Sequence, residues 1–305
     1  MKALITGGSG FIGTHFARRL SRQSFDVTIF DKRVPCAESL NHCHFIQGDL
    51  LDLEQVKETI DGFDIVYHLA ANADISKGAQ DTALDLQLTT IATYNVLEAM
   101  RINAVKSLVF LSGSGVYGYT GGKSVNEESG PLLPVSLYGA AKLAAESLIS
   151  AFANMFDMKA LIVRPANIVG GGQTHGVLFD FLHKLKVDKK RLEILGDGNQ
   201  TKSYLHVDDL CDAVALALST DSERVHVINV SSDDLIDVNW IARTTIDFLD
   251  LTDVTITHTE GRVGWVGDVP TIKLDTTKLK RLGWIPKFGS KTAILKALEE
   301  LSAQN

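Results

Sequence analysis

The chain has 305 residues, of which 45% are hydrophobic, enough for one large packed domain or two modest ones. Its formal net charge of −7 contains no long run of one sign, which excludes nucleic acid and an anionic membrane surface as main partners. No apolar stretch approaches the roughly 18 residues that span a bilayer, and the first apolar run is too short for a signal peptide. We therefore expect a cytoplasmic protein whose ligand is a small molecule.

The cysteine content agrees with a reducing compartment. Cys36, Cys43 and Cys211 are odd in number, and their spacing fits no disulfide framework. His42 and His44 flank Cys43, but this spacing matches no usual zinc pattern. No metal site is predicted.

A glycine-rich segment follows the first apolar run, residues 3–5. Gly7, Gly10 and Gly13 permit a tight turn, a close approach of backbone to a ligand, and close packing of a helix on a strand. The helix that begins here directs its free N–H groups toward an anion. The segment predicts a strand, a turn and a helix that hold the pyrophosphate of a dinucleotide, although such turns also occur without a ligand.

The second predicted strand, residues 27–30, ends at Asp31. A carboxylate at this place can accept both hydroxyls of an adenosine ribose and repels a 2′-phosphate, which favours NAD over NADP. Two alternatives stay open. Asp31 can be a solvated loop residue, and the adjacent Lys32 and Arg33 can tolerate a phosphate.

Strand and helix patterns alternate along the chain. After the second strand, further strands are expected at residues 45–46, 64–69, 108–111, 160–163 and 225–230, and helices at about 53–60, 84–101, 138–156 and 294–301. Repeated pairing of strand and helix implies an α/β fold with a doubly wound parallel sheet of Rossmann type, covered on both faces.

The chemistry-bearing residues stand after the strand at 108–111. Ser112, Gly113 and Ser114 follow that strand, and Tyr138 and Lys142 enter the next helix. Residues four apart share one helix face, so the ammonium of Lys142 is expected to lower the pKa of the Tyr138 phenol and make it a base. Such a pair alone is a weak signal, because it also occurs by chance on solvated helices.

With these motifs the chain resembles the extended short-chain dehydrogenase/reductase family, in particular its nucleotide-sugar epimerases and dehydratases. The resemblance covers nearly the whole chain and rests on the segments at residues 6–13, 48–50, 68–71, 116–118, 126–127, 138–142, 164–167 and 196–204. It implies that Tyr138 and Lys142 are catalytic and also contact NAD. The other cofactor contacts that it implies are Gly7, Gly10, Phe11, Ile12, Gly13, Asp31, Lys32, Asp49, Leu50, Leu69, Ala70, Ala71, Thr89 and Pro165.

The resemblance also assigns a nucleoside diphosphate sugar as substrate. The implied contacts are Ser114, Asn167, Gln200, Lys202, Tyr204 and Arg262. Lys202 stands where the family usually has Arg, and a lysine supplies the counter-charge without a bidentate fork. Trp265 occupies the usual place of a second Arg, and Arg262 lies near enough to substitute, whereas Trp265 can stack on a base or fill the core.

Two further departures concern the reacting centre. Thr89 replaces a family Asn that contacts the cofactor and can still form a hydrogen bond. Gly113 stands where the family has a catalytic Ser or Thr, so Ser112 and Ser114 are the candidate hydroxyls, although strand alternation directs neighbours differently.

The family's dehydratases and decarboxylases need a carboxylate at the segment that here reads Gly113, Ser114, Gly115. The remaining chemistry is that of an NAD-dependent 4-epimerase, in which Tyr138 removes a hydroxyl proton and the hydride leaves and returns through NAD. The alternatives are a nucleotide-sugar 4-ketoreductase or dehydrogenase, and a weakly active or inactive homologue that binds the sugar nucleotide or NAD.

The resemblance further implies a homodimer. The helices at about 84–101 and 138–156 carry apolar residues on more than one face, which a thick core within one chain can also explain. We expect an NAD-binding domain of residues 1–170 and 207–240, and a smaller, discontinuous C-terminal substrate domain of residues 171–206 and 241–305.

Overall fold

The computed structural model describes residues 1–35, 42–72, 74–220, 223–259 and 261–303, so Cys36 lies outside the described residues. The predicted α/β architecture is confirmed. Within these ranges, no helix combines the length and the apolar character that crossing a membrane requires.

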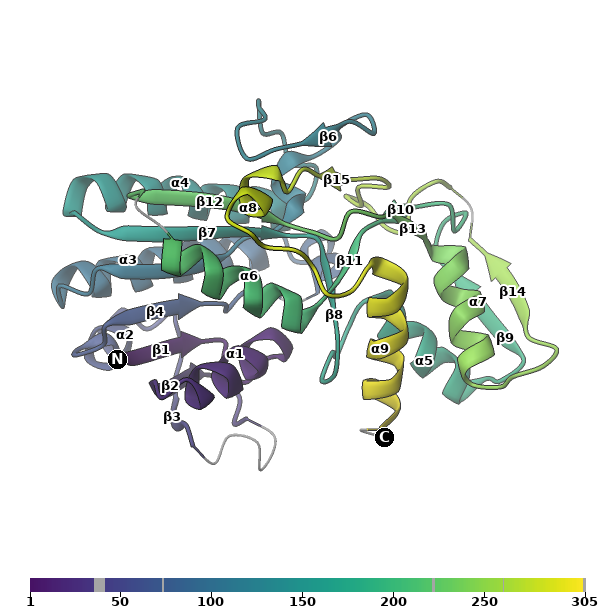
Figure 1. The fold of residues 1–305 in the computed structure, drawn as a ribbon, viewed down its shortest axis with the longest axis horizontal. Helices are drawn as coiled ribbons and strands as arrows, with labels where there is room; N and C mark the ends of the chain where they lie inside the picture. The colour runs from purple at the N-terminus through teal and green to yellow at the C-terminus, as the bar shows by residue number, and fades with distance from the viewer. Residues whose placement is uncertain (36–41, 73, 221–222, 260, 304–305) are drawn as a thin grey trace.

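A seven-stranded parallel sheet forms the centre of the larger part of the molecule (Figure 1). β1 lies between β4 and β2, so the strand order reverses beside β1, and the carboxyl ends of the strands there are the expected ligand site. In spatial order the strands are β12 (Val225–Val230), β7 (Lys159–Pro165), β5 (Ser107–Leu111), β4 (Ile65–His68), β1 (Lys2–Thr6), β2 (Asp26–Asp31) and β3 (His44–Gln47).

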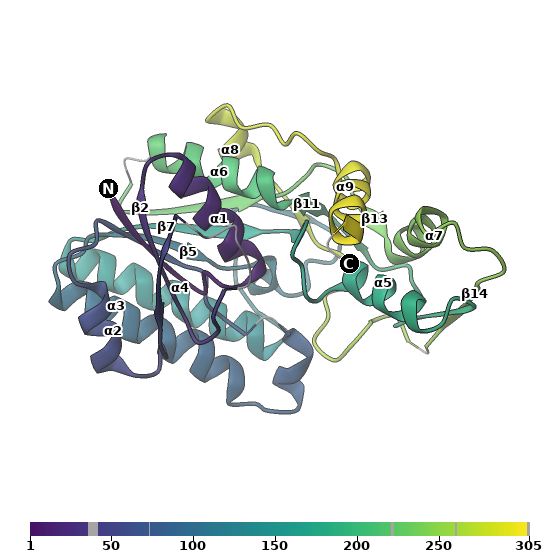
Figure 2. The ribbon, with the colours of Figure 1, turned by 90° about the horizontal axis from the view of Figure 1, so that it is seen from below.

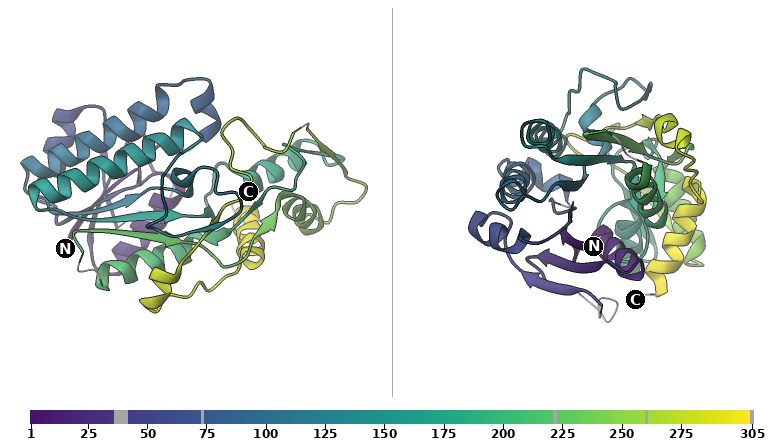
Figure 3. Two further views of the ribbon diagram at one scale, coloured as in Figure 1. Left: turned by 90° about the horizontal axis from the view of Figure 1, so that it is seen from above. Right: turned by 60° about the vertical axis from the view of Figure 1, so that its left-hand side comes forward.

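Helices cover both faces of this sheet (Figures 2 and 3). Successive side chains of a strand point to opposite faces, so Ile5 packs with Phe16 in one core cluster and Leu4 packs with Val96 in the other. The first face carries α1 (Phe11–Arg22), α6 (Val207–Thr220) and α8 (Thr277–Arg281), and the second carries α2 (Leu53–Ile60), α3 (Ala92–Ile102) and α4 (Leu137–Phe156).

The helix expected at about 84–101 differs from the prediction. Its first part, η3 (Leu86–Ile91), is a π-helix, and the α-helix begins only at Ala92. The β-branched Thr89, Thr90 and Ile91 fit poorly against a preceding α-helical turn. Two threonine hydroxyls in and next to this segment donate to backbone carbonyl oxygens. Thr93 Oγ1 donates to the carbonyl oxygen of Thr89 at 2.6 Å, and Thr90 Oγ1 donates to that of Ala141 at 3.2 Å.

A smaller group of elements stands beyond the carboxyl ends of the large sheet (Figure 1). α5 (Val177–Val187), α7 (Val238–Phe248) and α9 (Ser290–Ala303) share one core cluster, and only α9 was predicted. Four two-stranded sheets complete the described fold: β8 (Asn167–Val169) with β11 (Tyr204–His206), β9 (Arg191–Ile194) with β14 (Thr255–His258), β10 (Thr201–Lys202) with β13 (Ile236–Asp237), and β6 (Ser124–Val125) with β15 (Lys273–Leu274).

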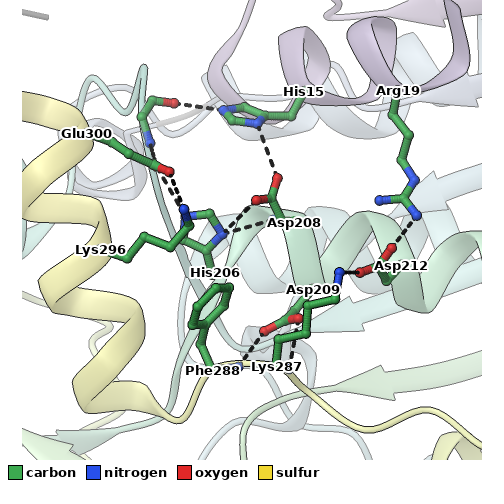
Figure 4. A network of polar contacts seen from close by, with 11 residues as sticks. His15, Arg19, His206, Asp208, Asp209, Asp212, Lys287, Phe288, Lys296 and Glu300 are labelled. Carbon is green, nitrogen blue, oxygen red and sulfur yellow. Dashed lines mark hydrogen bonds and ion pairs between the residues drawn. The ribbon is translucent and has the colours of Figure 1, made fainter. Parts of the chain in front are cut away.

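A polar network joins α1, α6 and α9 (Figure 4). The buried His206 contacts Glu300 of α9, with 3.1 Å between Nε2 and Oε2. Gly171 N donates to the same Glu300 oxygen at 2.8 Å, and His15 Nε2 of α1 donates to Gly171 O at 2.8 Å. The chain at Gly171 is therefore held from two sides, by the first helix and by the last.

Candidate active site

The glycine turn has the geometry of an anion site. Gly7 adopts φ +72°, and a Cβ there would lie 2.7 Å from Ala70 Cα. A Cβ on Gly13 would overlap the carbonyl oxygen of Gly7. Among the described residues, no side chain caps α1, and its first turn contains no acidic residue. The free N–H groups at this helix end therefore favour an anion, as the sequence predicts for a pyrophosphate.

Asp31 lies beside this turn at the end of β2. Its Oδ2 accepts from Ser9 N at 3.1 Å, and its Oδ1 accepts from Arg33 N at 3.0 Å, so the carboxylate is held in place. Lys32 forms an ion pair with Asp49 at 2.9 Å. This pair neutralises one of the two cations that could have attracted a 2′-phosphate, which supports NAD.

One cavity of about 810 Å³ connects this turn with the predicted substrate residues. It is lined by every residue that the sequence assigned to the cofactor, the substrate or catalysis except two. Thr89 is fully buried and its Oγ1 has no hydrogen-bond partner in the described part of the chain. Arg262 is exposed on its loop, while Trp265 lines the cavity.

Tyr138 and Lys142 lie on the first turns of α4, which begins after the N-cap Ser136. Lys142 is buried, and its Nζ lies 5.7 Å from the Tyr138 ring centroid and donates to Leu111 O at 2.6 Å. Burial lowers the pKa of Lys142 to about 7, although the charges of Glu146 and Asp85 oppose this shift.

The expected direction of the Tyr138 pKa was wrong. Burial, together with the charge of Asp85, raises the pKa of the phenol to about 12. Burial destabilises the charged form of both groups, and it opposes the mutual effect that the spacing predicts.

The three residues after β5 have different surroundings. Ser112 Oγ donates to Glu146 Oε1 at 2.5 Å, and Glu146 also binds Arg164, with 3.0 Å from Nε to Oε1. Ser114 lines the cavity. Gly113 is extended, with φ −176°, and a Cβ there would lie 3.8 Å from the Tyr138 hydroxyl in ordinary contact. The backbone and the space at Gly113 therefore accept a side chain beside Tyr138.

His68 is a buried residue near Lys142 that does not line the cavity, and the sequence did not indicate its role, although it stands within the segment at residues 68–71. Its Nδ1 lies 2.7 Å from Thr6 Oγ1, and its Nε2 lies 3.0 Å from Thr93 Oγ1. Thr93 already donates to Thr89 O, so His68 Nε2 carries the proton and Nδ1 accepts from Thr6. Burial lowers the pKa of His68 to about 3, which keeps it neutral beside Lys142.

At the end of the cavity that holds the predicted substrate residues, the charges are paired with one another. Lys202 Nζ lies 2.5 Å from Asp268 Oδ1 and 5.0 Å from the Trp265 ring centroid. Asp268 is buried and its Oδ2 accepts from Gly264 N at 3.2 Å. Gln200 Oε1 is buried, and no partner for it lies within the described ranges. The sequence did not predict a role for Asp268, because its partner Lys202 lies far away in the chain.

Relatives of known structure share this architecture. A crystal structure of UDP-galactose 4-epimerase matches all of this chain and 99% of its own, with 33% identity and a TM-score of 0.90. UDP-glucose 4-epimerase of Thermus thermophilus, solved in complex with NAD, covers 98% of both chains at 28% identity and a TM-score of 0.88.

Sequence comparisons agree. A putative UDP-glucose 4-epimerase of Methanocaldococcus jannaschii is 29% identical over 317 aligned positions, which cover 99% of each protein. Residues 3–231 match the profile of the NAD dependent epimerase/dehydratase family. The chain therefore belongs to the NAD-dependent epimerase/dehydratase family, and its cofactor is NAD, as the sequence predicted.

Proposed function

We propose that the protein is a nucleotide-sugar 4-epimerase that oxidises its substrate transiently to a 4-keto sugar. One observation carries the proposal. Tyr138 and Lys142 lie in the same cavity as the glycine turn, while Gly113, Ser114 and Gly115 offer no carboxylate for the elimination of water. The arrangement suits removal and return of a proton at one hydroxyl.

NAD supplies the hydride acceptor for this oxidation. The phenolate form of Tyr138 takes the proton of the sugar hydroxyl, and the phenol that results later returns this proton. In its charged form Lys142 stabilises the phenolate of Tyr138. Burial lowers the pKa of Lys142 to about 7, and the charges of Glu146 and Asp85 oppose this shift. Ser114 is the remaining candidate for a hydroxyl contact to the sugar, because Ser112 donates to Glu146.

The substrate end of the cavity supports a nucleoside diphosphate. Lys202 is the proposed counter-charge, and Asn167, Gln200 and Tyr204 line the cavity beside it. We assign no contact with the diphosphate to Arg262, because it is exposed outside the cavity. The relatives named above act on UDP-sugars, so UDP-glucose and UDP-galactose are the first substrates to test.

The test is incubation of the purified protein with single UDP-sugars, followed by NMR of the anomeric protons. We expect both C4 epimers to appear without added NAD. Tyr138→Phe should slow this by roughly 10²- to 10⁴-fold while the bound NAD content stays the same. Stoichiometric consumption of added nicotinamide cofactor would indicate a ketoreductase instead, and binding without turnover would indicate an inactive homologue.

We also propose a homodimer formed through the helices of the second face. Leu86, Ile91, Tyr94 and Met155 are large apolar side chains on η3, α3 and α4, and each is at least 41% exposed. Burial of such a patch stabilises association. Sedimentation at micromolar concentration should give a mass near twice 33.2 kDa, and Tyr94→Glu should shift it toward the monomer. A monomeric parent protein would refute the dimer.

A further inference from the structure

Asp85 is a buried carboxylate to which the proposed mechanism gives no contact with substrate. It is 1% exposed, and its Oδ1 accepts from Asn72 Nδ2 at 3.0 Å. Its Oδ2 is buried and has no hydrogen-bond partner in the part of the chain that the structure describes. Nor does any described cation form an ion pair with it. A buried charge that is only half satisfied is costly, so its position calls for a reason.

Asp85 lies behind the first turn of α4. It directly precedes the π-helix η3, and such helices occur frequently at functional sites. A Cβ on Gly78 would overlap Asp85 Oδ2 and would also lie 3.8 Å from Leu137 Cβ, so Gly78 stands between the carboxylate and α4. The other end of η3 is tied to α4 through the hydrogen bond from Thr90 to Ala141 O.

Leu137 and Ala141 are the neighbours in sequence of Tyr138 and Lys142. The segment of residues 85–90 therefore supports the short stretch of helix that carries the reacting pair. A side chain at position 78 would overlap the Asp85 carboxylate, so Gly78 allows this carboxylate to lie close to the first turn of α4.

The other charged groups near the pair are accounted for. Glu146 on α4 is bound by Arg164 from β7, with 2.5 Å between Oε2 and Nη2. His68 from β4 is neutral. Before η3, Asp74 lies 3.7 Å from Lys77 of the short 3₁₀ helix η2 (Ile75–Ala79), and the two charges offset each other. Asp85 is thus the carboxylate near Tyr138 and Lys142 that forms no ion pair within the described residues.

We propose that Asp85 is a positioning residue that sets the charge of the Tyr138–Lys142 pair from behind the first turn of α4. The proposal rests on the role given to Tyr138 in the proposed function. The negative charge of Asp85 raises the pKa of both groups. It favours the protonated form of Lys142 against the effect of burial, and it makes the Tyr138 phenolate scarcer but a stronger base.

The test compares Asp85→Asn with Asp81→Asn in the protein with its bound cofactor. Asp81 is exposed on the same segment and accepts from Ala83 N at 3.1 Å, which an Asn also permits. For each variant, the phenolate absorbance is followed against pH, and the same variant with Tyr138→Phe is subtracted. Asp85→Asn should lower the Tyr138 midpoint by about one pH unit, and Asp81→Asn should leave it unchanged.

The pH profile of kcat/KM is the second readout. Both limbs should move to lower pH in Asp85→Asn, because the pKa values of Tyr138 and Lys142 fall together. An unchanged Tyr138 midpoint, or an equal shift in Asp81→Asn, would overturn the proposal. Should Asp85→Asn fail to fold, Asp85→Ser removes the charge with a smaller side chain and is expected to give the same shift.

The two readouts separate this proposal from the proposed function. The absorbance titration needs no substrate, so it remains decisive if no nucleotide sugar is turned over. If the Tyr138 midpoint shifts in Asp85→Asn while the parent protein shows no epimerisation, the proposed role of Asp85 is supported and the proposed epimerase function is refuted.

Discussion

The two ends of the cavity are built by different means. At the cofactor end, backbone contacts define the site, because Gly7 and Gly13 leave no room for a side chain. At the proposed substrate end, side chains from distant segments form ion pairs, as Lys202 and Asp268 do. Backbone geometry demands particular residues at fixed spacing, whereas a charge pair leaves no local pattern. The cofactor can therefore be identified from sequence, and the sugar cannot.

The strongest test of this contrast is Gly13→Ala. The new Cβ would overlap the Gly7 carbonyl oxygen, so the turn must open, and NAD affinity should fall by roughly 100-fold. Gly10→Ala is the graded comparison, because its Cβ would lie 3.2 Å from the same oxygen and should cost less. NAD content after purification and the Tm of each variant measure the effect. Equal NAD content in both variants would contradict a site defined by backbone.

Asp31→Asn tests whether a side chain matters at the cofactor end. The ratio of NAD to NADP affinity should fall about tenfold or more, because an amide neither repels a phosphate nor makes charge-assisted hydrogen bonds. Titration of both dinucleotides into protein freed of cofactor gives this ratio. Asp26→Asn, an exposed change at the other end of the same strand, should leave the ratio unaltered. An unchanged affinity ratio in Asp31→Asn would contradict the assignment of Asp31 to the ribose of NAD.

Opposite changes at the substrate end should act in opposite directions. Lys202→Ala should weaken UDP binding about tenfold, because the counter-charge is lost. Asp268→Asn should strengthen UDP binding by several-fold, because the charge of Lys202 is then no longer neutralised by a buried carboxylate. Calorimetric titration with UDP at two salt concentrations measures both. Weaker binding in both variants would mean that the pair serves the structure of the loop and not the ligand.

The smallest expected effect concerns the reacting centre. Gly113→Ser places a hydroxyl beside Tyr138 without strain, and we expect kcat to rise about fivefold, the worth of one neutral hydrogen bond. Gly115→Ser is the matched control, because a Cβ there would face the Gly139 backbone instead. A gain in Gly115→Ser, or a loss in Gly113→Ser, would show that the hydroxyl is not the missing feature.

Much of the large sheet could be predicted, because its buried strands are continuous apolar runs. The predicted bounds of β12 and α2 agree with the structure. The short strands outside the large sheet gave no clear pattern, since two to four residues carry little periodicity. The helices α5 and α7 were not predicted either, although each has 11 residues. The π-helix was missed because its apolar spacing resembles that of an α-helix.

The candidate site follows the same division. Tyr138 and Lys142 share a helix, so their spacing placed them together. Asp85 and Asp268 act on residues far away in the sequence, and only the fold brings these charges near one another. The pKa of Tyr138 was misjudged for a related reason, because burial depends on all the elements that surround a side chain.

The double anchoring of Gly171 limits how this protein can be recombined. Its amide donates to Glu300 in the last helix and its carbonyl accepts from His15 in the first, so the start of the predicted substrate domain is held by both ends of the chain. A chimera that exchanges residues 171–206 alone would inherit a loop whose two anchors belong to another sequence. When this segment is replaced by that of a relative to change substrate specificity, the relative's residues at the positions of His15 and Glu300 should be transferred with it.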